Sequence, residues 1–148
     1  MSPAGASPTG GPAATASSAR GGSGSLTVKA FFEGVRQGHL VVQRCLGCRA
    51  LAVPPKAVCP ACEATTWEPA PLEGEGQVAS FTVIRVPPGR LAALAPYPIV
   101  LVRMTEGVSL LGRMVDTSLD AIRVGLAVRV RPPADPAADP PVVTFGPR

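Results

Sequence analysis

All four cysteines of this 148-residue chain fall within RCLGCRALAVPPKAVCPAC, residues 44–62. They form two C-x-x-C pairs, Cys45 with Cys48 and Cys59 with Cys62, separated by ten residues that include a double proline. A C-x-x-C pair on a tight turn presents two sulfurs to one ion, and a second such turn completes the tetrahedron of thiolates typical of structural zinc. The spacing therefore predicts one structural Zn²⁺ per chain, which would fold a segment that otherwise lacks a core.

Other roles for the four thiols are less well supported by the sequence. A disulfide needs an oxidising compartment, whereas the N-terminus has no secretory signal, so we expect a cytoplasmic protein with reduced thiols. A thioredoxin-like redox centre would leave one C-x-x-C pair unexplained. A catalytic cysteine needs a histidine, but the single one, His39, lies near a predicted helix end and is expected to face solvent. Iron in a rubredoxin-type site is chemically possible, so the spacing favours zinc without fixing the metal.

The first 25 residues have a composition of their own. They contain six each of glycine, alanine and serine, together with three prolines. Such a segment cannot bury enough apolar surface to offset the entropy of ordering, so residues 1–25 are expected to be a disordered tail or a linker. No run of 18 or more apolar residues occurs in the chain, and the sequence therefore predicts no membrane-spanning helix.

A short helix is predicted between this tail and the cysteines. In residues 26–40, Phe31, Phe32 and Val35 stand at helical spacing and Gly38 can end the helix, which we expect over 28–37. A helix this short needs a surface to dock on, so the two phenylalanines either pack on the chain itself or anchor a partner subunit. Residues 41–72 then form the ribbon, with two short strands and with Trp67 packed against the metal turns.

Residues 73–148 are mostly strand and predict a small barrel. Two apolar runs meet at the tight Glu106-Gly107 turn, which is a hairpin signal, and Ser118 can cap one helical turn. Five strands with a short helix between the third and fourth are the layout of an OB-fold. The expected fold class is therefore mostly β: a short N-terminal helix, a rubredoxin-like zinc ribbon and a five-stranded OB-fold barrel. The expected strands are 77–86, 97–105, 108–116, 126–132 and 142–146.

Charge and side-chain chemistry limit the function. The net charge of +4 is a mild bias, well short of the basic footprint of a nucleic-acid binder, and the few barrel aromatics are expected in the core. A nucleic-acid-binding module therefore stays as the alternative reading, and nucleic acid is not the expected partner. Acyl chemistry needs a nucleophile or base and oxyanion donors, but the thiols are committed and the carboxylates form no recognisable pair. We expect no enzyme activity from the chain alone; a stand-alone enzyme with unrecognised residues is a third possibility.

The chain resembles a known family, the zinc-ribbon and OB-fold proteins called domain of unknown function 35. The resemblance covers about residues 31–130, and the matching pieces stand in the family's order. One departure is Arg49, where many members carry glycine, but the four cysteines are intact. The matching pieces are FFEGVRQGHLVVQRCLGC, PPKAVCPAC, GEGQVASFTVIRVPP, PYPIVLVRMTEGVSLLGRMVD and VGLAVRV.

This resemblance implies a non-catalytic companion of thiolase-superfamily enzymes. The partner would be a thiolase, a hydroxymethylglutaryl-CoA synthase-like enzyme or a thiolase-like aldolase of steroid side-chain degradation, joined with this chain in a hetero-oligomer. The chain would stabilise that enzyme and help to shape its CoA and substrate channel, so that acyl-CoA is met through the partner. Candidate contact residues are Phe31 and Phe32 for the partner, and Arg85, Arg103 and Arg113 for CoA.

Overall fold

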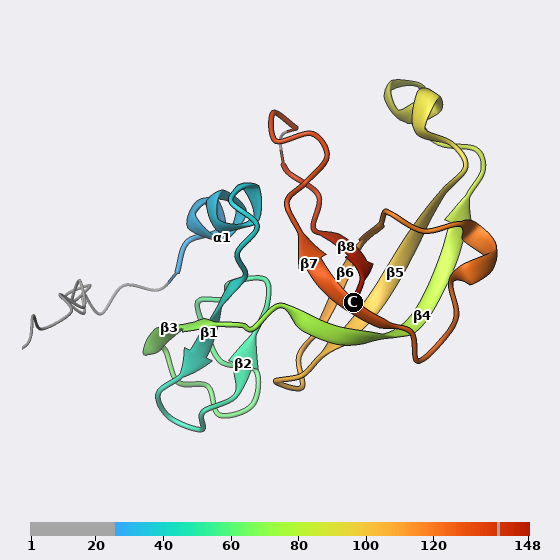
Figure 1. Cartoon of the computed structure of the whole chain (residues 1–148). Helices are drawn as coiled ribbons and strands as arrows, with labels where there is room; N and C mark the ends of the chain where they lie inside the picture. Colours follow the sequence, from blue (N-terminus) through green and yellow to red (C-terminus); the bar gives the residue numbers. More distant parts are fainter. Residues whose placement is uncertain (1–25, 139) are drawn as a thin grey trace, which may run out of the picture.

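The computed structural model describes residues 26–138 and 140–148, so the tail predicted for residues 1–25 lies outside the described part. The described residues form one α-helix, eight strands and two 3-10 helices (Figure 1). None of these helices combines the length and apolar character needed to cross a membrane. The elements in chain order are α1 (Val28–Arg36), β1 (Val41–Cys45), β2 (Leu51–Ala52), β3 (Trp67–Pro71), β4 (Glu75–Ile84), η1 (Gly89–Leu94), β5 (Tyr97–Met104), β6 (Ser109–Met114), η2 (Leu119–Ala121), β7 (Ala127–Arg131) and β8 (Thr144–Pro147).

Helix α1 begins and ends at residues suited to those places. The Oγ1 atom of Thr27 accepts a hydrogen bond from the backbone N–H of Ala30 at 3.1 Å, which caps the N-terminus. Gly38 has a φ of 77°, and the backbone N–H of His39 donates to the carbonyl of Gly34, as in a Schellman motif. The predicted helix is therefore confirmed to within one residue at its C-terminus.

The cysteine region folds as a three-stranded antiparallel sheet in the order β2-β1-β3. Two of these strands were predicted, and β3 was not. Its sequence, WEPAP, contains Pro69 and Pro71, which argue against a central strand because proline cannot donate to the ladder. Strand β3 lies at the edge of the sheet and pairs with β1 alone, so the two prolines are tolerated there.

The rest of the chain closes into a barrel in the order β4-β5-β6-β8-β7. Four of the five strand pairs are antiparallel, and β6 runs parallel to β8. This is the predicted five-stranded OB-fold, with η2 between its third and fourth strands. The strand bounds differ from the predicted ones by up to two residues, as at β4, which begins at Glu75 rather than at residue 77, and at β8, which begins at Thr144 rather than at residue 142. The 3-10 helix η1, which was not predicted, fills the connection between β4 and β5.

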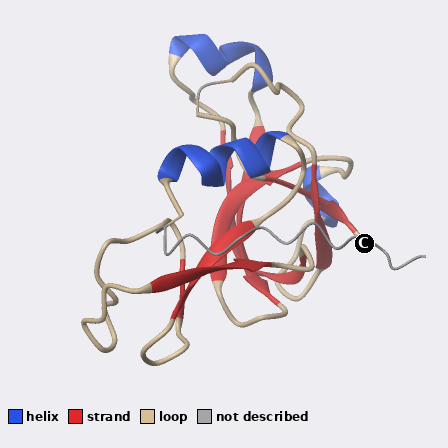
Figure 2. Ribbon diagram, turned by 90° about the vertical axis from the view of Figure 1, so that its left-hand side faces the viewer, coloured by secondary structure: helices blue, strands red, loops and turns tan. Residues whose placement is uncertain are grey.

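The barrel, α1 and β1 share one hydrophobic core. Phe31 and Val35 of the helix and Val42 of the ribbon belong to the same buried cluster as the barrel residues Val100 and Phe145. Figures 1 and 2 show the helix lying beside the barrel and above the ribbon sheet. The backbone N–H of Leu72 also donates to the carbonyl of Leu40, so the segment between ribbon and barrel is tied to β1.

Candidate metal centre and barrel surface

The two cysteine pairs stand on two turns with the same hydrogen-bond pattern. The carbonyl of Cys45 accepts from the backbone N–H of Arg49 at 2.9 Å, and the carbonyl of Cys59 accepts from that of Glu63 at 2.9 Å. Both Arg49 and Glu63 adopt the left-handed conformation, with φ of 65° and 62°. The left-handed turn explains why glycine suits the position of Arg49, since glycine adopts this backbone without steric cost.

The two turns bring the four thiols together. All four Sγ atoms lie within 4.8 Å of one another. The Sγ of Cys45 lies 3.5 Å from that of Cys62, and the Sγ of Cys48 lies 3.7 Å from that of Cys59. Four mutually close sulfurs, two buried and two exposed, suit a tetrahedral thiolate site, and all four sequence-predicted metal ligands are therefore brought to one place.

The surroundings of Cys45 and Cys62 shift the pKa values of their thiols in opposite directions. The backbone N–H of Cys48 lowers the pKa of the Cys45 thiol, and despite burial this pKa falls to about 7. The backbone N–H of Ala64 lowers the pKa of Cys62, but the neighbouring thiols of Cys45 and Cys48 raise it by more, to about 12. Sulfurs this close cannot all carry negative charge unless a cation lies among them. The donor set therefore fits a structural metal ion.

Trp67 packs against the cysteine turns, as its place in the sequence predicts. It is buried in a small cluster with Cys45, Cys59 and Ala52. Its indole Nε1–H donates to the carbonyl of Ala57 at 3.1 Å, which fixes the loop leading into the second cysteine turn.

A buried polar residue that the sequence analysis did not single out also holds the ribbon. The side chain of Gln43 is fully buried on β1. Its Oε1 accepts from the backbone N–H of Lys56 at 2.7 Å, and its Nε2 donates to the carbonyl of Leu26 at 3.3 Å. It therefore links the loop between the cysteine turns to the segment before α1. The stretch LVVQRC places Gln43 beside Arg44 between Val42 and Cys45, and nothing in this local pattern says which of the two polar side chains is buried.

The two phenylalanines proposed for partner contact are placed differently. Phe31 is 4% exposed and lies in the core, where its ring meets Phe32 edge-on with centroids 5.3 Å apart. Phe32 is half-buried at the margin of this core. In this structure the ring of Phe31 is covered by its own chain, and Phe32 is the one of the pair with surface to offer.

The three arginines proposed for CoA contact lie on one half of the barrel. Arg103 is exposed on β5, Arg113 is half-buried on β6, and Arg85 is exposed just past the end of β4. None of the three has an ion-pair partner among residues 26–138 and 140–148. Arg103 and Arg148 line one hollow of about 330 Å³, together with Glu75, Gln77 and Thr105.

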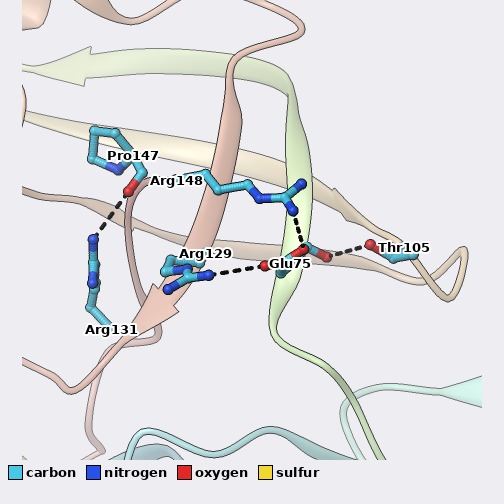
Figure 3. Close-up of polar contacts among 6 residues, drawn as sticks. All are labelled: Glu75, Thr105, Arg129, Arg131, Pro147 and Arg148. Atoms are coloured by element: carbon cyan, nitrogen blue, oxygen red, sulfur yellow. Dashed lines mark hydrogen bonds and ion pairs between the residues drawn. The ribbon is translucent and has the colours of Figure 1, made fainter.

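Glu75, which lines the same hollow, contacts two arginines (Figure 3). Its Oε1 accepts from Nη2 of Arg129 at 3.0 Å, and its Oε2 lies 3.5 Å from Nη2 of Arg148. The hydroxyl of Thr105 donates to the backbone carbonyl of Glu75 at 3.1 Å. Sequence reasoning missed this cluster because its members come from β4, β7, the β5–β6 turn and the C-terminus, and no local pattern joins them.

A rubredoxin-like ribbon with four clustered thiols, followed by a closed five-stranded barrel, defines a zinc-ribbon and OB-fold protein. Two family models agree: the rubredoxin-like zinc ribbon domain of ChsH2 matches residues 32–68, and the C-terminal OB-fold domain of ChsH2 matches residues 69–132. Relatives of the same build are named DUF35 domain-containing scaffold proteins, and the chain belongs to this DUF35 family. The resemblance drawn from the sequence is thus confirmed.

The chain spans very different fractions of the lengths of two curated relatives. A DUF35 domain-containing scaffold protein of Methanocaldococcus jannaschii is 30% identical over 72% of this chain and 77% of its own length. A probable enoyl-CoA hydratase alpha subunit of Thermomonospora curvata is 39% identical over 66% of this chain, but the match spans 30% of that protein.

Two solved structures with DUF35 in their names are also similar to this chain. A chain of the Ltp2-ChsH2(DUF35) aldolase is 36% identical, with a TM-score of 0.69 over 79% of this chain and 91% of that one. A DUF35-family protein of unknown function from Sulfolobus solfataricus has a TM-score of 0.57 over 81% of this chain and 84% of its own, at 19% identity, and this likeness concerns the fold alone.

Proposed function

We propose that this chain is a non-catalytic accessory subunit or domain that binds a thiolase-like acyl-CoA enzyme, stabilises it and helps to shape its CoA and substrate channel. The observation that carries the proposal is the 36% identity, over 91% of the other chain, to a DUF35 chain of the Ltp2-ChsH2 aldolase. The scaffold-protein names of the archaeal relatives support the same role. The hydratase named for the Thermomonospora relative is not carried over, because the chain spans only 30% of it.

The chemistry of the described residues supports a passive role. The four thiols form one cluster, and a closed thiolate site has no open position at which to activate water. His39 is exposed, does not belong to the cluster of thiols, and lines a hollow together with Glu73, Glu75 and Arg129. The chain would thus act as a scaffold, and a partner is expected to supply the nucleophile and base for the reaction.

We assign the metal as one structural Zn²⁺ per chain. Cys45, Cys48, Cys59 and Cys62 would hold it, and its binding energy would maintain the ribbon. The paired turns fit this assignment because each of them places its two thiols beside those of the other.

The nucleic-acid alternative finds little support in the barrel surface. Phe145 is fully buried and Tyr97 is half-buried, which leaves Phe81 as the one substantially exposed barrel aromatic in the described part of the chain. Binding of single strands uses several exposed aromatic platforms on a basic groove.

Of the three arginines, Arg103 is the best placed to meet CoA that a partner holds. Its guanidinium has no carboxylate partner among the described residues and lines the 330 Å³ hollow beside Arg148. Glutamine variants of Arg85, Arg103 and Arg113 in the assembled complex would rank the three. We expect Arg103→Gln to raise the KM for acyl-CoA most.

Reconstitution tests the proposal directly. Purified chain and purified Ltp2 would be mixed and separated by size-exclusion chromatography with light scattering. The proposal predicts a stable hetero-oligomer and a higher melting temperature for Ltp2 in the mixture than alone. Separate elution with an unchanged melting temperature would contradict it.

A further inference from the structure

One outward face of the barrel carries a row of apolar side chains. Across β5, Val100 and Val102 point inward and are fully buried, so the alternate residues Tyr97, Ile99 and Leu101 point outward. The strand register places Ile84 of β4 opposite Tyr97, and Leu111 of β6 opposite Leu101. These five residues, Ile84, Tyr97, Ile99, Leu101 and Leu111, form what we call the outer apolar row.

The row remains open to solvent. Leu111, one of the most exposed large apolar side chains of the described residues, is 64% exposed. The other four members are half-buried. Five contiguous apolar side chains on three adjacent strands form a patch, and patches of this kind mark interaction surfaces.

Unpaired arginines border the row. Arg113 lies directly opposite Ile99, and Arg103 follows Leu101 on the same face of β5. Neither has a carboxylate partner among the described residues, whereas Arg129 and Arg148 are both paired with Glu75. Arg103 thus lies past one end of the row and Arg113 on its β6 side, and a complementary surface is apolar at its centre and carries negative charge opposite these two arginines.

A second copy of this chain does not meet that requirement. In a two-fold dimer built on the row, the second copy would bring the same two arginines to the contact, and no member of the row carries a carboxylate, so Arg103 and Arg113 would gain no opposite charge. A different protein is the better occupant, with carboxylates opposite Arg113 and, at Arg103, either a carboxylate or a phosphate of the CoA that it holds.

We propose that the outer apolar row, with Arg103 past one end and Arg113 on its β6 side, is the surface that docks the thiolase-like partner. This inference rests on the proposed function and adds the place and the chemistry of the contact: a partner surface with an apolar centre and acidic groups opposite the two arginines. Leu111 is the most exposed member of the row and forms the centre of the contact on β6.

The test compares the same substitution at two exposed leucines in the full chain. Leu111→Asp places a charge in the row, and Leu46→Asp places the same charge on a side chain that is 48% exposed but lies on the ribbon, outside the row. Both variants should fold, which near-ultraviolet circular dichroism and melting would check. With Ltp2 as the probe, we expect at least tenfold weaker binding for Leu111→Asp and a less than threefold change for Leu46→Asp. Leu111→Lys should weaken binding less than Leu111→Asp, because the partner is expected to be acidic beside the row.

The outcomes separate the two proposals. If the wild-type chain does not bind Ltp2, the proposed function fails and this inference falls with it. If the wild type binds and Leu111→Asp binds equally well, the accessory role stands and the outer apolar row is not the docking surface. Equal losses from Leu111→Asp and Leu46→Asp would likewise overturn the assignment, because added charge alone would then explain the effect.

Discussion

The sulfur of Cys45 lies 3.5 Å from the sulfur of Cys62, although the two residues are 17 positions apart in the chain. No disulfide joins them, and the turns that carry them share one hydrogen-bond pattern. Such an approach of free thiols is expected where a metal ion replaces their protons. We therefore predict one zinc per chain by elemental analysis of freshly purified protein, without the visible absorbance of an iron-thiolate site.

Replacing Cys59 by Ser should unfold the ribbon. Structural zinc supplies about 10–16 kcal/mol of apparent binding energy in small zinc-binding peptides, and loss of a buried ligand removes much of it. Circular dichroism and amide exchange should report lost structure over residues 41–71 and stoichiometric loss of zinc. The control is Leu46→Ser, at an exposed position that follows Cys45 in the chain and supplies no metal ligand. An unchanged melting curve for Cys59→Ser would mean that the ribbon does not depend on the metal.

Metal retention should depend on pH in a definite direction. The pKa of Cys45 is lowered to about 7, chiefly by the backbone N–H of Cys48, from an ordinary value of 9.0. A lowered pKa contributes stability that is present above pH 9 and is lost as the pH falls through 7. Protonation of the other thiols competes with the metal in the same direction. Titration with a zinc-sensitive dye should find full retention at pH 8 and progressive release below pH 7; release that increased toward alkaline pH would contradict this.

Arg49→Gly should stabilise the first cysteine turn. The φ of 65° at Arg49 is costly for a residue with a Cβ atom, and glycine removes that cost. Glycine also gains entropy in the unfolded chain, so we expect a net gain below about 1 kcal/mol in the free energy of unfolding. Arg49→Ala is the control, since it removes the same 3.9 Å contact with Glu68 without relieving the backbone. Denaturant melts would compare the three proteins.

The sequence predicted the features that depend on local spacing, and it did not predict those that depend on distant partners. The metal ligands, α1 and the β5–β6 hairpin follow from C-x-x-C pairs, helical periodicity and a glycine turn. Strand β3 was not predicted because its prolines argue against a strand. The edge position that tolerates them is set by the whole sheet and cannot be read from the local sequence. The contact of Glu75 with Arg129 joins residues 54 positions apart, and the burial of Phe31 depends on the barrel that the helix covers.

Gly112→Ala tests the closure of the barrel. A Cβ atom at Gly112 would lie 2.6 Å from the ring of Phe145 and 2.6 Å from the carbonyl of Val143, which is closer than atoms can pack. Because β6 meets β8 here, we expect a loss of about 1–3 kcal/mol in the free energy of unfolding. Gly89→Ala is the control, since nothing lies within 4 Å of its added methyl group. Equal stability of both variants would place the β6–β8 contact in doubt.

The accessory role itself is tested most directly by one activity measurement. Aldolase turnover by Ltp2 would be measured alone, with this chain, and with the chain in the absence of Ltp2, at equal protein concentrations. The account predicts no turnover by the chain alone and higher turnover by Ltp2 when the chain is present. Acyl-CoA turnover by the chain alone, abolished by a substitution outside the four cysteines, would contradict the account.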